Sequence, residues 1–359
     1  MQTDARPRYE NIDALRGVAA LLVIARHCSD LMCSIPAARH TGAVLCRISE
    51  DVDLGRVGVV AFFAISGFVI YPTIRGTPWQ GTRSFLIRRF FRIYPAYWLS
   101  MVLGYFVLWL ALDRSLGVGQ MVANASMLPS LFGAPYIMGQ YWTLEVEIVF
   151  YVLIVALFLS RMIRSPLVLV AMIVACIALQ VLVTLRWISA DGDPQWRIIG
   201  VNLATMFWGA LLRQWHDAPS PRVALGPLTL RLVTLVASTT TLFVASLISA
   251  MVRHLNPETL PSLMAHLVGL GMFLLTVLFV RRVPRPMAWL GTISYSIYLL
   301  HPVVMYPLWS AANGGGGLAR LGIAPLMALT MTCAIAAAAL SYYAVEKPAI
   351  ALGRRLTRH

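Results

Sequence analysis

The sequence predicts an all-α, polytopic integral membrane protein, a bundle of about ten transmembrane helices. Composition is the first observation: 59% of the 359 residues are hydrophobic and only 12% are charged, which is far more apolar than a water-soluble domain. The second is that apolar runs of about 20 residues, the length that a helix needs to cross a bilayer, follow one another along the chain. The third is an uneven distribution of arginine between alternate loops.

The apolar runs divide the chain into ten expected spans. Their limits are 12–32, 56–75, 93–112, 141–160, 166–187, 197–213, 228–250, 260–280, 287–311 and 322–344. The segments between them are short, and those at 217–227 and 314–317 contain the proline and glycine that are typical of loops. We therefore expect one membrane domain over residues 1–359, with no fused extracytoplasmic domain.

Arginine and lysine favour one side of the predicted membrane. With the N-terminus inside, 20 of the 29 lysine and arginine residues fall in cytoplasmic segments, eight fall in outer segments, and Arg26 lies within the first span. This is the positive-inside bias, which for an even number of spans places both termini in the cytoplasm. The bias also explains the net charge of +14 without a nucleic-acid partner.

The first span, 12–32, carries ionisable side chains inside its apolar sequence. Arg16 and His27 are eleven residues apart, so they share one face of a helix and are separated by roughly 16 Å along its axis. Such groups are costly in a membrane span, and they usually face a bundle interior or a wet cavity and mark function. Because they interrupt the apolar core and no small-residue cleavage site follows, the span is not a signal peptide.

The loop before the third span holds the densest cationic patch. Its arginines include Arg88, Arg89 and Arg92, which we expect on an interfacial helix where Arg88 and Arg92 share a face. One interpretation is that they anchor an inner loop and bind anionic lipid headgroups. The other is that their guanidinium groups bind the phosphate oxygens of a cytoplasmic substrate.

The fourth span, 141–160, opens with Trp142 and two carboxylates, Glu145 and Glu147. Because they are two residues apart, the carboxylates point to nearly opposite faces. Both could lie in the headgroup region, where they cost little. Alternatively, Glu147, which precedes apolar sequence, is either protonated or needs a partner, and Arg26 and His27 are expected in the same outer half.

Three further residues have side chains or positions that suggest a role: His301 and Glu346 near the C-terminal end of the chain, and Gly67 in the second span. His301, beside serine and tyrosine in span 287–311, is either a satisfied bundle residue or a catalyst, and Pro302 should kink its helix. Glu346 is placed to form a local ion pair with Lys347. Gly67 is expected to allow close approach of two helices.

The five cysteines are scattered. Cys46 and either Cys28 or Cys33 would lie on the outer side, where a disulfide can form. We favour the interpretation that the cysteines act as isolated small hydrophobic residues. No spacing typical of metal ligands occurs, so we predict no metal site.

Five motifs in register give the chain a recognisable pattern. They are Asp13-x-x-Arg16 followed by His27, Phe62-Phe-x-x-Ser66-Gly67-Phe, Arg89-x-x-Arg92-Ile-Tyr-Pro95, Trp142-Thr-Leu-x-x-Glu147 and Ser294-Tyr-x-x-Tyr-Leu-Leu-His301. Together they closely resemble the membrane-bound acyltransferase-3 family, particularly its bacterial polysaccharide O-acyltransferases. The resemblance extends from Tyr9 to about Pro348.

The resemblance implies an enzyme of the bacterial inner membrane that moves an acyl group, usually acetyl, from cytoplasmic acyl-CoA to a hydroxyl of a cell-surface carbohydrate or lipid-linked sugar. Acyl-CoA is then a co-substrate, no tightly bound cofactor is expected, and the other partners are the acceptor and membrane lipids. With this resemblance we expect His27, Glu147 and Arg16 as catalytic residues, Arg88, Arg89, Arg92 and Ser66 as acyl-CoA-binding residues, and Asp13, Trp142, His301 and Glu346 as supporting residues; all of these except Arg88 and Glu346 lie in the motifs.

The expected chemistry centres on His27. A histidine side chain has an ordinary pKa near neutrality, which suits it to take a proton from an incoming hydroxyl, with Glu147 orienting the imidazole. His27 could instead accept the acyl group itself. Two alternatives remain: a transporter or flippase of a polysaccharide assembly system, and a non-catalytic membrane component of such a system. Acyl transfer by purified protein that is lost in His27→Ala would exclude both.

The arginine bias yields a topology prediction. Reporter fusions should place residues 76–92 and 214–226 in the cytoplasm and residues 188–196 outside, because positively charged loops stay on the inner side. A reporter at 76–92 that is active outside would contradict the assignment of the arginine-rich loop to a cytoplasmic donor.

Overall fold

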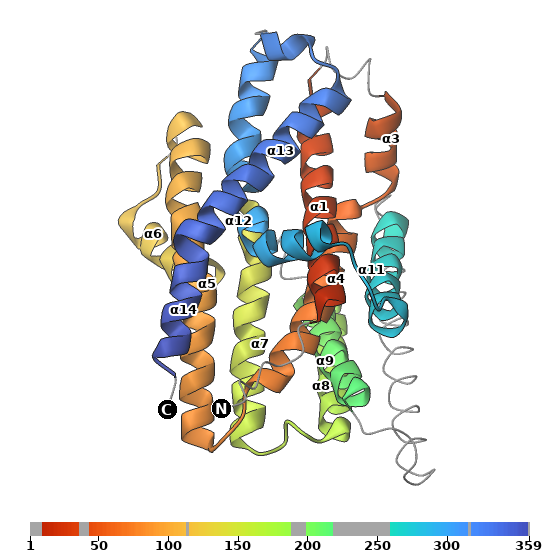
Figure 1. Cartoon of the computed structure of the whole chain (residues 1–359), viewed down its shortest axis with the longest axis vertical. Coiled ribbons are helices and arrows are strands. Elements are labelled where there is room, and N and C mark those ends of the chain that lie inside the picture. Colours follow the sequence, from red (N-terminus) through yellow and green to blue (C-terminus); the bar gives the residue numbers. More distant parts are fainter. Residues whose placement is uncertain are drawn as a thin grey trace. The chain divides into compact units, whose positions relative to one another are not determined.

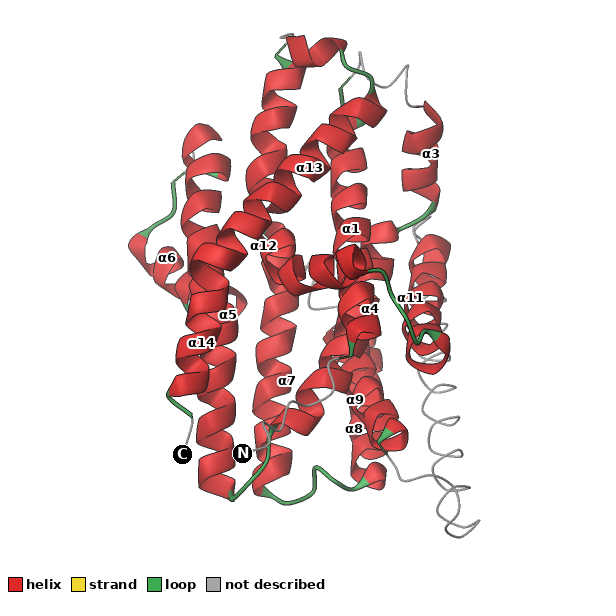
Figure 2. Cartoon of the chain, in the orientation of Figure 1, coloured by secondary structure: helices red, strands yellow, loops and turns green. Residues whose placement is uncertain are grey.

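The computed structural model describes residues 9–35, 43–112, 115–187, 199–217, 259–314 and 317–357. All regular elements in these ranges are helical (Figure 2), which confirms the all-α class. Among the described residues, four stretches are long and apolar enough to cross a membrane: Leu54–Thr73, Gly139–Leu159, Pro166–Val183 and Ile323–Arg355. The count of ten spans stays a prediction, and the expected span 228–250 lies outside the described residues.

The helices are coloured in chain order in Figure 1. Their bounds are α1 Glu10–Met32, α3 Ala43–Asp51, α4 Leu54–Ile70, α5 Pro78–Leu108, α6 Val118–Ala125, α7 Trp142–Leu159, α8 Pro166–Trp187, α9 Ile199–His216, α11 Thr259–Phe279, α12 Arg285–Asn313, α13 Ile323–Ser341 and α14 Lys347–Arg355. Short 3₁₀ turns join several of them, including η1 (Tyr71–Thr73). Apart from α5, the helices that correspond to expected spans begin and end close to the predicted limits.

Helix α5 differs from the expected span 93–112. It begins at Pro78, fifteen residues earlier, so that the arginine-rich segment and the span form one continuous helix of 31 residues. Thr77 caps this helix by accepting a hydrogen bond from the backbone nitrogen of Gln80, and proline is favourable in the first turn. Pro95 lies within the helix without ending it. Arg89 is therefore about 16 Å along α5 from its start.

Two compact units can be distinguished. Unit 1 comprises residues 1–62 and 268–342, and unit 2 comprises residues 63–267 and 343–359. The first boundary falls within α4 and the last at the π-helix Tyr342–Glu346, which follows α13 and leads into α14. The expectation of a single domain over 1–359 stays a prediction, and each unit is described by itself.

In unit 1, α1 packs along α12 at a contact between glycines. A Cβ at Gly291 would lie 1.6 Å from the carbonyl oxygen of Asp13, and one at Gly17 would lie 2.9 Å from the backbone nitrogen of Gly291. Only glycine leaves room for backbones this close. Helix α13 packs on both helices, and the shared core contains Ile24 and Ile297, both fully buried.

A disulfide joins Cys33, just after α1, to Cys46 of α3, with a Cα–Cα distance of 5.9 Å. The interpretation that the cysteines are isolated small hydrophobic residues is therefore wrong for these two. The pairing depends on α3 returning beside the end of α1, and α3 was not among the expected spans. Cys28, Cys176 and Cys333 are free.

In unit 2, α9 packs closely on α4. A Cβ at Gly67 would lie 1.7 Å from the carbonyl oxygen of Met206, and one at Gly209 would lie 2.2 Å from that of Ala64. The predicted close approach at Gly67 is confirmed. Helix α14 lies along α5, as the dark blue and orange helices in Figure 1 show.

The contact between α1 and α12 predicts a strong effect of one methyl group. Gly291→Ala should destabilise the protein by about 1–3 kcal/mol or more, because the added Cβ forces the two backbones apart. The measurement is the thermal unfolding of the purified protein in detergent. Gly271→Ala on α11 is the matched control: no atom lies within 4 Å of its Cβ, and alanine favours a helix. Equal melting temperatures of Gly291→Ala and wild type would contradict this close packing of α1 on α12.

Candidate active site

Two histidines meet in unit 1, one from α1 and one from α12. The rings of His27 and His301 are stacked, with centroids 5.2 Å apart and planes inclined by 29°. His27 is exposed, whereas His301 is only 1% exposed. Each histidine lies ten residues beyond a glycine of the contact between Gly17 and Gly291, so the two helices run in the same direction between these points.

His301 is held from one side only. Its Nδ1 lies 2.8 Å from the carbonyl oxygen of Tyr298 and 3.3 Å from that of Ile297. Because a carbonyl oxygen only accepts hydrogen bonds, Nδ1 carries the hydrogen. Nε2 is buried and has no hydrogen-bond partner among the described residues. The ring of Tyr298, which also contacts Phe62, lies 6.1 Å from that of His301. The buried imidazole therefore presents an unused nitrogen lone pair.

Other ionisable residues lie along α1, at both ends of the helix relative to His27. Arg26 forms an ion pair with Asp30, from Nε to Oδ2 at 2.9 Å. Asp13 and Arg16 are half-buried nearer the start of the helix. The predicted alignment of Arg16 with His27 follows from the regular helix over Glu10–Met32.

The two carboxylates of α7 have separate partners in unit 2, as the prediction of opposite faces requires. Glu145 is buried and accepts hydrogen bonds from the backbone nitrogen and hydroxyl of Ser130, at 3.1 and 2.5 Å, and from the hydroxyl of Tyr136. Glu147 accepts a hydrogen bond from the hydroxyl of Tyr151. Glu145 is thus fixed by the connection that precedes α7, and Glu147 by its own helix.

Arg89 of α5 connects Tyr151, the partner of Glu147, with η1. Its guanidinium lies over the rings of Phe85 and Tyr151, at 5.5 and 5.6 Å from the centroids. Its Nη2 donates a hydrogen bond to the hydroxyl of Thr73 at 3.1 Å. Glu147, Tyr151, Arg89 and Thr73 therefore form one polar series in unit 2.

Arg88 and Arg92 share a face of α5, as expected, and that face meets the C-terminal segment of unit 2. Arg88 donates from Nε to the hydroxyl of Thr357 at 2.7 Å. Arg92 lies 2.5 Å from a carboxylate oxygen of Glu346, which is fully buried. The expected local pair of Glu346 with Lys347 is wrong, because the π-helix that ends at Glu346 brings this carboxylate to Arg92. The ammonium of Lys347 lies over the ring of Tyr343.

Two other predicted residues lie in unit 2. Ser66 is half-buried on α4, one residue before the contact of Gly67 with α9. Trp142 begins α7 as predicted, and its ring lies 6.1 Å from that of Phe63. It also lines a small cavity together with Glu145 and Tyr136.

The structure brings together His27 and His301, which the sequence treated separately. Glu147, the expected partner of His27, belongs to unit 2 with Tyr151, so its pairing with His27 stays a prediction. The polar partners Ser130, Tyr136 and Tyr151 were missed. The signal for them was present, since a carboxylate inside apolar sequence needs hydrogen-bond donors, but the sequence does not say which donors reach it.

Two comparisons with known proteins bear on this chain. The family model described as "Acyltransferase domain" matches residues 9–339. The chain is also similar to "Protein 2 in picA locus" of Rhizobium radiobacter, with 30% identity over 165 residues, which are 40% of this chain and 78% of that protein. No solved structure matches.

The contact of Arg92 with Glu346 predicts a structural role that can be separated from ligand binding. Arg92→Ala leaves a buried carboxylate without its arginine, which should cost about 3–5 kcal/mol. Adding Glu346→Ala should recover part of this loss, because the uncompensated charge is removed. Thermal unfolding of both single variants and the double variant gives the coupling. Additive effects of the two substitutions would show that the pair contributes no such coupling.

Proposed function

This chain belongs to the acyltransferase family whose domain model it matches, as the sequence resemblance predicted, and we propose that this membrane acyltransferase is an O-acyltransferase. Its donor is cytoplasmic acyl-CoA, with acetyl-CoA the first to test, and its acceptor is a hydroxyl of a cell-surface carbohydrate or lipid-linked sugar. The observation that carries the proposal is the exposed imidazole of His27 stacked on the buried imidazole of His301.

His27 is suited to act on substrates because it is accessible. Its ring is exposed, while one of its faces lies on His301, whose Nδ1 is held by the carbonyl of Tyr298. A fixed neighbouring ring limits the orientations of His27 and lowers the entropy lost on reaching a reactive geometry. When His27 gains a proton, the π-face of His301 also offers a favourable contact for the positive charge.

In the direct route, His27 removes the proton of the acceptor hydroxyl while that oxygen attacks the thioester carbonyl carbon. The new C–O bond forms, the C–S bond breaks, and His27 returns the proton to the departing thiolate. In the covalent route, a ring nitrogen of His27 attacks the carbonyl first. An N–C bond replaces the C–S bond, and the N–H proton of the ring goes to the departing thiolate. In the second step the acceptor oxygen forms a C–O bond, the N–C bond breaks, and the released imidazole takes the proton of the hydroxyl.

The remaining predicted residues have supporting roles in the proposal. Arg89, which lies over Tyr151 and contacts Thr73, binds a phosphate of the donor. Arg88, Arg92 and Ser66 stay predicted donor contacts, although the first two are already engaged by Thr357 and Glu346. Glu147 supports the charged form of His27, and Arg16 marks the inner end of the polar face of α1.

The proposed orientation places both termini in the cytoplasm of a bacterium, with the protein in its inner membrane. The arginine bias supports this orientation. The disulfide between Cys33 and Cys46, which follows the expected outer end of α1, supports it independently, because disulfides persist in oxidising compartments outside the cytosol.

The decisive test is transfer of a labelled acetyl group by purified protein. His27→Ala should abolish transfer while donor binding and the melting temperature stay near those of wild type, because the removed side chain is exposed. Glu147→Gln should lose much of the rate, because a neutral amide cannot stabilise an imidazolium. Mass spectrometry after quenching distinguishes the routes, since an acylated His27 occurs only in the covalent one.

Thr332→Ala, which truncates an exposed side chain of α13 in the same unit, is the matched control and should retain wild-type transfer. Near-normal turnover by His27→Ala would contradict the assignment and move the chemistry to His301. Absence of transfer by wild type with every acyl-CoA and carbohydrate offered would contradict the proposed donor and acceptor.

A further inference from the structure

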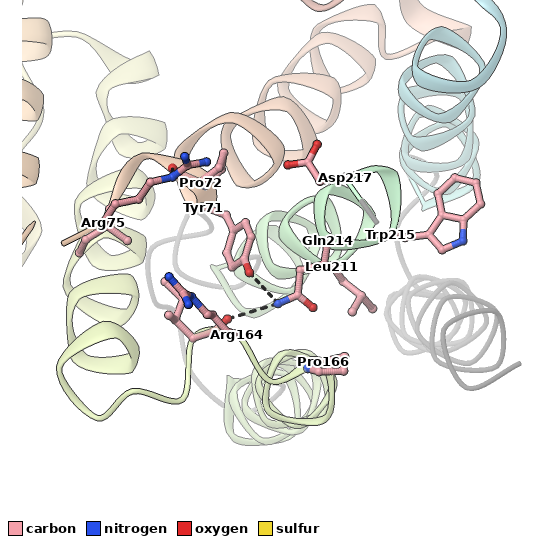
Figure 3. Close-up of a pocket in the computed structure, with 11 residues that line it drawn as sticks. Tyr71, Pro72, Arg75, Arg164, Pro166, Leu211, Gln214, Trp215 and Asp217 are labelled. Carbon is pink, nitrogen blue, oxygen red and sulfur yellow. Dashed lines mark hydrogen bonds between the residues drawn. The ribbon is translucent and has the colours of Figure 1, made fainter. Parts of the chain in front are cut away.

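A pocket of about 460 Å³ opens in unit 2 and is lined by residues of that unit alone. It is built by three connections: the turn after α4, the segment between α7 and α8, and the end of α9 (Figure 3). All three fall at the predicted cytoplasmic ends of their spans. The volume is within the range of about 300–1,000 Å³ that is typical of small-molecule sites.

Two arginines line this pocket: Arg75, which belongs to the cationic segment before the third expected span, and Arg164, for which no ligand was predicted. Arg75 and Arg164 are both exposed. Arg75 is oriented by a hydrogen bond from its Nε to the carbonyl oxygen of Pro72 at 2.7 Å, which leaves its two terminal nitrogens for other acceptors. Two guanidinium groups at one opening favour a ligand with several anionic oxygens.

Tyr71 adds a neutral donor between the arginine side and α9. Its hydroxyl oxygen accepts a hydrogen bond from Nε2 of Gln214 at 2.7 Å, and Gln214 also contacts the carbonyl oxygen of Ile163 at 3.4 Å (Figure 3). The hydroxyl oxygen is thus used as an acceptor, and its own hydrogen can be donated to a ligand.

The acidic group of the pocket is already neutralised. Asp217 forms an ion pair with Arg213, from Oδ2 to Nε at 2.7 Å, and its other oxygen lies 3.5 Å from Nδ1 of His216. The charge that the pocket offers to a ligand is therefore positive. An anionic ligand is therefore attracted by the arginines and is not repelled by an unpaired Asp217.

The opposite part of the pocket is apolar and includes an indole. Trp215 and Leu211 of α9, with Ile163 and Pro166, line it. These apolar side chains make no favourable contact with a phosphate group, but they can pack against a flat heteroaromatic ring. A ligand that combines phosphate groups with a base would use both parts.

We propose that this pocket binds the phosphorylated nucleotide portion of the acyl donor, the part of coenzyme A that carries an adenine ring and three phosphate groups. This inference rests on the proposed function, which supplies a cytoplasmic acyl-CoA. Thr73, next to the pocket residue Pro72, contacts Arg89, so the polar series toward Tyr151 and Glu147 begins at the same turn. The headgroup of an anionic lipid offers phosphate as well but lacks the base.

The test uses the full chain in nanodiscs of phosphatidylcholine, with coenzyme A and adenosine 3′,5′-bisphosphate as probes for calorimetry. The double variant Arg75→Ala/Arg164→Ala should bind both probes about tenfold more weakly or worse, because two charge-assisted contacts are lost. Tyr71→Phe should weaken binding less. Arg83→Ala removes an exposed arginine of the same inner segment that does not line the pocket, and it should bind both probes as wild type does.

Kinetics give an independent readout. The double variant should raise the KM for acyl-CoA with little change in kcat, whereas His27→Ala should lose kcat and keep its affinity for both probes. Unchanged probe affinity in the double variant would overturn the inference, even if His27→Ala confirms the proposed function. A third outcome is that wild type binds adenosine 3′,5′-bisphosphate, the double variant does not, and wild type transfers no acyl group. This outcome would support the pocket as a nucleotide site and would contradict the proposed function.

A second set of titrations, with an anionic lipid present, distinguishes a nucleotide ligand from a lipid headgroup. The same titrations in nanodiscs that contain phosphatidylglycerol should show only modest competition with adenosine 3′,5′-bisphosphate. If native mass spectrometry shows that the double variant loses bound phosphatidylglycerol while its nucleotide affinity is unchanged, the pocket is a lipid site and the inference is wrong.

Discussion

The close contact of Gly17 with Gly291 is the constraint on which the candidate active site depends. Helices associate in membranes through packing of small residues rather than through the hydrophobic effect, and here the backbone of α12 reaches the carbonyl of Asp13. From this point α1 and α12 run in the same direction, and ten residues later they carry His27 and His301. The stacking of the two rings is thus a consequence of helix packing. It provides an accessible imidazole over a buried one.

Buried polar groups in unit 2 follow a different rule. The carboxylate of Glu145 accepts hydrogen bonds from Ser130 and Tyr136 in the connection that precedes its helix, and that of Glu346 pairs with Arg92 from a distant part of the chain. Such pairing offsets the cost of burying charge and fixes the segments that supply it. In the pocket of unit 2, by contrast, the arginines at the opening are exposed. Paired charges therefore support the helices, while exposed cationic groups at a concave surface are suited to a ligand.

Most helices could be predicted from the sequence, because an apolar run of the right length is sufficient evidence for a span. The start of α5 could not, since its first turns are rich in arginine and the apolar pattern does not show that they continue into the span as one helix. The motif histidine His301 was noted, but its contact with His27 depends on which helices pack together, which local patterns do not contain. The disulfide between Cys33 and Cys46 was considered but not favoured, and the pocket around Arg75 was missed, because each depends on how segments that are separate in the chain pack together.

The central claim is that acyl transfer takes place at the stacked pair of His27 and His301. The most direct measurement is the single-turnover rate of transfer from saturating acyl-CoA in His301→Ala, with His301→Phe as the variant that keeps a flat ring beneath His27. The account predicts a fall of about tenfold or more in His301→Ala at unchanged donor affinity, and partial recovery in His301→Phe. A wild-type rate in His301→Ala would contradict it, since transfer would then not depend on the ring that positions His27.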